Sequence, residues 1–150
     1  MLKGIDPLLS PTLLKVLCEM GHGDEIVVAD ANFTAETLGY GKHIIRLPCI
    51  SLHRACQAVL SVFPLDAAVA QPVMYMKVCD TPADYASALQ QSVIGLLAET
   101  GSAEPAQCEA VERFAFYERV KHAYAIVQTG EMQPYANFIF KKGVIADALA

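Results

Sequence analysis

The feature that most constrains the fold is an alternation of short apolar runs with longer segments of helical periodicity. The first apolar run, Glu25–Ala29, is too short for a typical helix and lacks polar alternation, which is typical of a strand buried on both faces. Further strands are predicted at residues 43–47, 73–79, 124–129 and 135–141. Buried strands need covering layers on both faces of their sheet.

Helical patterns separate these strands. Ser10 can cap the first helix, Pro11 suits its first position, and Gly21 is expected to end it in the left-handed conformation. Helices are predicted at residues 11–20, 51–63, 81–99 and 114–123, with a loop at 100–107 and an ambiguous segment at 110–113. The pattern predicts one three-layer α/β/α domain over residues 1–150, with a mixed, mostly buried sheet and a frayed tail at 145–150.

Composition and charge exclude several classes of protein. The formal charge of −5 argues against nucleic-acid binding, which requires clustered positive charge. With 54% apolar and 18% charged residues, the chain is too apolar for a disordered protein. The longest uncharged stretch, 85–98, has 14 residues against about 20 for a membrane span. The opening MLKGIDPLLSP is not typical of a secretory signal, so we expect a soluble, cytoplasmic protein.

The cysteines support this expectation. Five cysteines occur without a C-x-x-C pair, which fits neither a zinc site nor a disulfide framework. Buried free thiols in a reducing compartment are predicted.

Two residues near the first strand are candidates for chemistry. His22 stands between Gly21 and Gly23, and its imidazole can exchange a proton near neutral pH, although a helix C-terminus also favours histidine. Asp30 directly follows the strand, where a carboxylate serves either as a loop cap or as a ligand acceptor. The spacing does not establish that His22 and Asp30 meet.

Two further segments carry candidate residues. Arg113 and Tyr117 are four apart on one face of a predicted helix, opposite a face expected to bury Phe114, although an ordinary amphipathic helix has the same pattern. A guanidinium with five donors can hold several oxygen atoms. Tyr135 and Asn137 suit a polyhydroxylated ligand, and equally an ordinary turn before the last strand.

Taken together, the motifs resemble the L-fucose mutarotase / D-ribose pyranase family. They follow the family's order over essentially the whole chain: LLKVLxEMGHGDEI at 13–26, ADANF at 29–33, RFAFYER at 113–119, TGE at 129–131, YAN at 135–137 and KKGV at 141–144. Arg113 resembles the fucose branch, because the ribose branch usually has a histidine at this position.

The resemblance implies a cofactor-free and metal-free isomerase that interconverts sugar anomers. It implies His22 as the proton donor and Tyr117 as a second catalytic candidate. The residues that it implies for binding the sugar are Asp30, Asp66, Arg113, Tyr135, Ala136 and Asn137. It also implies a homo-oligomer, commonly a decameric ring, in which a neighbouring subunit completes each pocket.

Three other functions stay open on the residues alone. The chain could be a D-ribose pyranase, which changes ring size as well as anomer, or a non-catalytic sugar-binding or transport-accessory protein. A metal-dependent hydrolase built on His22, Asp24 and Asp30 is disfavoured, because these ligands are few and mostly carboxylates.

Overall fold

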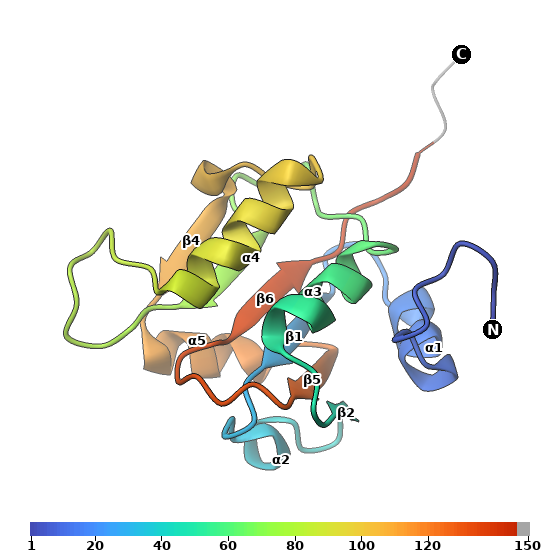
Figure 1. Cartoon of the computed structure of the whole chain (residues 1–150), viewed down its shortest axis with the longest axis horizontal. Helices are drawn as coiled ribbons and strands as arrows, with labels where there is room; N and C mark the ends of the chain where they lie inside the picture. Colours follow the sequence, from blue (N-terminus) through green and yellow to red (C-terminus); the bar gives the residue numbers. More distant parts are fainter. Residues whose placement is uncertain (147–150) are drawn as a thin grey trace.

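The computed structural model describes residues 1–146, and within them six strands form one mixed sheet in the order β2-β5-β1-β6-β3-β4 (Figure 1). The strands are β1 (Glu25–Ala29), β2 (His43–Leu47), β3 (Val73–Met76), β4 (Cys108–Val111), β5 (Ala125–Thr129) and β6 (Phe138–Lys141). The helices are α1 (Pro11–Glu19), α2 (Ala35–Leu38), α3 (Leu52–Leu60), α4 (Ala88–Glu99) and α5 (Arg113–Val120), with a short 3-10 helix at Pro105–Gln107.

The strand directions bring most loops of interest to one edge of the sheet. β1 pairs in parallel with β5, β5 with β2, and β3 with β4, whereas β6 is antiparallel to both β1 and β3. The C-terminal ends of β1 to β5 therefore lie at the same edge as the N-terminal end of β6. We call this the active edge and the other the opposite edge.

The three predicted layers are confirmed. α1, α3 and α4 pack on one face of the sheet, where Leu13, Leu52 and Phe138 are fully or almost fully buried. α2 and α5 cover the other face around Phe116 and Ile139. Because successive residues of a strand point to opposite faces, β1 contributes to both clusters, and all five of its residues are buried as expected.

The predicted end of the first helix is wrong in detail. Met20, after α1, is already extended (φ −61°, ψ 135°), and the positive φ of +86° belongs to Gly23 instead of Gly21. The Lys142 ammonium donates to the Leu17 and Met20 carbonyls. This side chain supplies the donor that a left-handed glycine cap would otherwise have provided.

The predicted helix at 81–99 begins too early. α4 starts at Ala88, where Ser87 and Gln90 form a capping box. The Thr81 hydroxyl donates to the Val78 carbonyl (2.7 Å), and the Thr81 carbonyl accepts from the Lys77 ammonium (2.7 Å). Thr81 is thus held in a turn after β3 and cannot cap a helix. β3 also ends at Met76 instead of residue 79.

Other expectations are resolved or corrected. The ambiguous segment at 110–113 contains both the end of β4 and the start of α5, while α2 was not predicted. All five cysteines are free, as expected. The expected burial of these thiols holds only for Cys56, because residue type alone does not decide which face of an element a thiol occupies. Of the predicted tail, Ile145 and Ala146 are in neither helix nor strand, and residues 147–150 lie outside the described residues. No helix within residues 1–146 has the length and apolar character needed to cross a bilayer.

Two glycines give opposite predictions for stability. A Cβ at Gly130 would lie 2.5 Å from the backbone nitrogen of Cys49, so we expect Gly130→Ala to lower the free energy of unfolding by about 1–3 kcal/mol. Gly95, inside α4, has no heavy atom within 4 Å of such a Cβ, so we expect Gly95→Ala to raise it by about 0.5–1 kcal/mol. Urea denaturation of both variants measures this; equal effects would contradict the packing at Gly130.

Candidate functional site

A cavity of about 270 Å³ opens at the active edge, where β1 and β3 end and β6 begins. Its volume is near the lower end of the range for small-molecule pockets, about 300–1,000 Å³, and suits a single small ligand. Its lining combines acid, amide, guanidinium and phenol groups with apolar surfaces: Asp30, Asn32, Phe33, Met76, Arg113, Tyr117, Pro134, Tyr135 and Asn137.

Asp30 and Asn137 form a reciprocal pair in this cavity. The Asn137 Nδ2 donates to Oδ2 of Asp30 (2.9 Å), and the Asp30 backbone N–H donates to Oδ1 of Asn137 (3.0 Å). Oδ1 of Asp30 also accepts from the Asn32 backbone N–H (2.9 Å). Both side chains are buried, and each carboxylate oxygen keeps a further acceptor position, since it carries two lone pairs. Asp30 is therefore fixed in place and can still accept a ligand hydroxyl.

Burial raises the pKa of the Asp30 carboxyl above its ordinary value of 3.8, and the hydrogen bonds from Asn137 and Asn32 only partly oppose this effect. A raised folded-state pKa means that the contribution of this group to stability is present at low pH and is lost as the pH rises through 3.8 and then through the folded-state value. We expect the stability of the wild type relative to Asp30→Asn to fall as the pH rises from about 3 to about 6. Urea denaturation across this range measures the slope, and a difference that rises with pH would contradict the prediction.

Arg113 and Tyr117 both line the cavity, which confirms that they share one face of α5. Glu112 fixes the start of this helix, because its carboxylate accepts from the backbone N–H groups of Phe114 (2.8 Å) and Ala115 (3.1 Å). The Arg113 Nε is buried without a hydrogen-bond partner in residues 1–146, which is uncommon for a buried donor, and the Arg113 side chain lines the cavity. The expected burial of Phe114 is wrong: its ring is 62% exposed and lies 4.7 Å from the Arg113 guanidinium carbon.

The Tyr135–Asn137 segment enters the cavity just before β6. Tyr135 has a positive φ of +63°, which is uncommon for a residue with a side chain, and its side chain lines the cavity. Ala136 is buried in the core, so its contribution to a site is limited to its backbone. The neighbouring Cys79 thiol raises the pKa of the Tyr135 phenol above its ordinary value of 10.

His22 and Asp66 lie together at the opposite edge of the sheet. The His22 Nε2 is 3.2 Å from Oδ1 of Asp66, and the imidazole is about half exposed. A backbone hydrogen bond from Ala68 and the neighbouring His22 lower the pKa of the Asp66 carboxyl. The five residues of β1 separate His22 from Asp30, a length of about 16 Å at the usual rise per residue, so the two do not meet within one chain.

Sequence reasoning missed part of the cavity wall. Asn32 and Phe33 were not named as site residues, although both belong to the ADANF motif at 29–33 that follows the first strand. Met76 and Pro134 carry no comparable signal, because Met76 was placed inside a longer strand and Pro134 was treated only as part of a turn.

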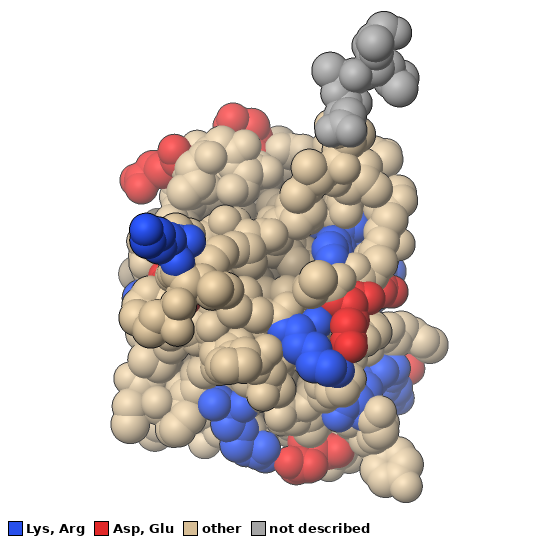
Figure 2. All heavy atoms as spheres, turned by 90° about the vertical axis from the view of Figure 1, so that its right-hand side faces the viewer, with Lys and Arg blue, Asp and Glu red and all other residues tan. Residues whose placement is uncertain are grey.

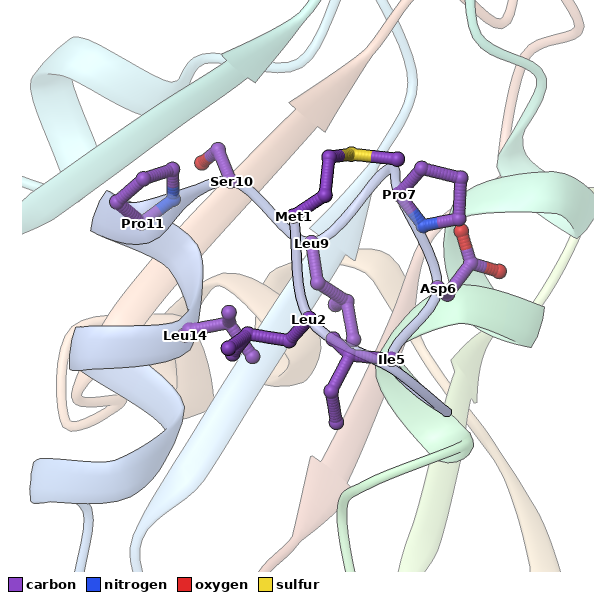
Figure 3. Close-up of a pocket in the computed structure, with 9 residues that line it drawn as sticks. All are labelled: Met1, Leu2, Ile5, Asp6, Pro7, Leu9, Ser10, Pro11 and Leu14. Atoms are coloured by element: carbon purple, nitrogen blue, oxygen red, sulfur yellow. The ribbon is translucent and has the colours of Figure 1, made fainter.

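Two other hollows lie beside the N-terminal segment and are mainly apolar. The first, of about 240 Å³, lies between this segment and α1 (Figure 3). Its apolar lining includes Leu2, Ile5, Leu9 and Leu14. The second, of about 390 Å³, shares Ile5 and Leu14 with it. The face that carries α1 shows wide uncharged areas between scattered charges (Figure 2). Neither hollow has the convergent polar groups of the cavity at the active edge.

Comparison with known proteins gives consistent matches over nearly the whole chain. The RbsD / FucU transport protein family matches residues 3–145. The L-fucose mutarotase of Glaesserella parasuis is 44% identical over 144 residues, which cover 96% of each chain. Two solved structures are similar: FucU from Bifidobacterium longum (TM-score 0.89, 40% identity, 96% of this chain and 100% of that chain) and the fucose mutarotase in complex with L-fucose from Streptococcus pneumoniae (TM-score 0.87, 38% identity, 97% and 100%).

Proposed function

The chain belongs to the RbsD / FucU family, and we propose that it is an isomerase that interconverts the α- and β-anomers of L-fucose by acid–base ring opening and closure. Family membership confirms the resemblance carried by the sequence motifs. The full-length similarity to L-fucose mutarotases and to a structure with bound L-fucose favours this sugar.

The observation that carries the proposal is the chemistry of the cavity at the active edge. Asp30 is a fixed acceptor, Arg113 adds the donors of its guanidinium, and Tyr135 and Asn137 add a hydroxyl and an amide. Sugar hydroxyls both donate and accept, so this mixture suits a monosaccharide better than a purely anionic or purely apolar ligand. Phe33 and Met76 provide apolar surface beside these groups.

In this proposal a second copy of the chain supplies the proton donor. His22 is exposed at the opposite edge and cannot reach the cavity of its own chain, so His22 of a neighbouring subunit completes each pocket. Exposed Met1, Leu2, Val144 and Ile145 favour burial of surface between copies. We propose a ring-like homo-oligomer, a decamer as is common in the family, that acts in the cytoplasm, where the five free thiols would persist.

The reaction needs two coupled proton movements. One proton leaves the anomeric hydroxyl and another reaches the ring oxygen, so the bond between the anomeric carbon and the ring oxygen breaks and an open-chain aldehyde forms. Rotation about the bond next to the aldehyde exposes its other face, and the reverse movements close the ring. His22 gives its proton to the ring oxygen. Tyr117 takes the proton of the anomeric hydroxyl while its own phenol proton passes to water, and ring closure returns both protons. Asp30, Arg113 and Asn137 hold the sugar. Asp66 orients the His22 ring through its carboxylate.

NMR saturation transfer between the two anomeric protons of L-fucose tests the proposal. We expect the protein to accelerate exchange for L-fucose more than for D-ribose or D-galactose. Faster exchange for ribose, accompanied by interconversion of pyranose and furanose forms, would indicate a pyranase. Sugar binding in a titration without any acceleration would indicate a non-catalytic binding protein. Either of these two results would overturn the proposed activity.

A further inference from the structure

Gln90 is a fully buried amide directly behind the wall of the cavity. It lies in the first turn of α4, where its Oε1 accepts from the Ser87 backbone N–H (2.9 Å). Its Nε2 donates out of the helix to the carbonyls of Met76 (2.7 Å) and Tyr135 (3.0 Å). Met76 and Tyr135 both line the cavity, whereas Gln90 does not. One side chain therefore joins α4 to two segments of the cavity wall.

Helix capping accounts for only half of this arrangement. A capping box needs an acceptor at this position, and glutamate supplies one as well as glutamine does. A carboxylate, however, has no N–H and cannot donate to the two carbonyls. The contacts made by Nε2 thus require an amide at Gln90 for a reason that lies outside α4, in the cavity wall.

The Tyr135 carbonyl is the point at which these contacts affect the site. Tyr135 holds a left-handed φ of +63°, a conformation that surrounding contacts must maintain. Its carbonyl accepts from the Gln90 amide and from the Asn137 backbone N–H (2.9 Å). On the other side of this turn, the Met76 backbone N–H donates to the Asn137 carbonyl (3.0 Å). Gln90 therefore bonds to both segments that enclose Asn137.

We propose that Gln90 is a positioning residue for sugar binding. It fixes the Tyr135 carbonyl and the end of β3, and thereby sets where the Tyr135 phenol and the Asn137 amide meet the sugar. This inference rests on the proposed function for its kinetic consequence, but the placement of Tyr135 and Asn137 can be tested without any sugar.

The test compares Gln90→Glu with Gln91→Glu in the full chain. Gln90→Glu keeps the length of the side chain and the capping acceptor but removes the donors, so we expect the KM for L-fucose to rise at least about fivefold, more than kcat changes. In the free protein, we expect the backbone amide NMR signals of Tyr135 and Asn137 to shift. Gln91 is exposed on the same helix, so Gln91→Glu should leave the KM within about twofold and these signals unmoved.

Two further variants separate positioning from stability. Ser87→Ala removes the capping hydroxyl, so we expect it to lower the melting temperature without changing the KM. Gln90→Met has similar length and no donor, so it should reproduce the KM effect if Gln90→Glu does not fold. An unchanged KM together with unmoved amide signals in a folded Gln90 variant would overturn the inference. Absence of anomer exchange in the wild type would overturn the proposed function instead. The backbone amide signals of Tyr135 and Asn137 would then still show whether Gln90 positions these two residues.

Discussion

Replacing His22 by glutamine should lower the rate of L-fucose anomer exchange at least about 100-fold, because a well-placed acid–base group contributes about 100- to 10,000-fold. Glutamine can still donate a hydrogen bond to Asp66 but cannot exchange a proton near neutral pH. Saturation transfer at fixed protein and sugar concentrations measures the loss.

The control for this variant is His122→Gln, which changes another exposed histidine outside the cavity. We expect His122→Gln to retain the wild-type rate. The free energy of unfolding should change little in either variant, within about 0.5 kcal/mol, because both positions are exposed. Undiminished exchange in His22→Gln would remove His22 from the mechanism.

The second large effect is expected at Arg113. Its guanidinium is the cationic group that lines the cavity, and hydrogen bonds to charged groups contribute about 1.5–3 kcal/mol each. We expect Arg113→Met to lower kcat/KM for L-fucose about 10- to 100-fold, mainly through a higher KM. Saturation transfer over a range of sugar concentrations separates kcat from KM.

Lys121→Met provides the matched control, because it removes a positive charge from the exposed end of the same helix. Its kcat/KM should remain within about twofold of the wild type. Equal losses in Arg113→Met and Lys121→Met would show that net charge, and not contact with the sugar, explains the effect.

Mixing chains that carry these two substitutions tests whether each site is shared between two copies of the chain. When His22→Gln and Arg113→Met chains are co-expressed, a pocket that combines residues of two copies is intact at about a quarter of the sites if the chains mix at random. We therefore expect the mixed protein to regain activity that neither variant has alone. Activity that stays at the average of the two variants would show that each chain uses only its own residues.

Much of the local structure follows from the sequence. Ser10 caps the helix that it was predicted to cap, and the buried run of β1 lies where its apolar pattern indicates. Arg113 and Tyr117 share one face because a helix places residues four apart on the same side. These features depend on neighbours within one helical turn or on side-chain alternation, so the sequence determines them directly.

The assembly of the site was decided only by the tertiary structure. Asp30 and Asn137 are 107 residues apart, and they meet because β6 enters the sheet antiparallel between β1 and β3. The same strand directions place His22 at the opposite edge, and the contacts of Gln90 cross from α4 to the wall of the cavity. Strand order and direction arise from hydrogen bonds between distant segments, and no local pattern of residues encodes such pairings.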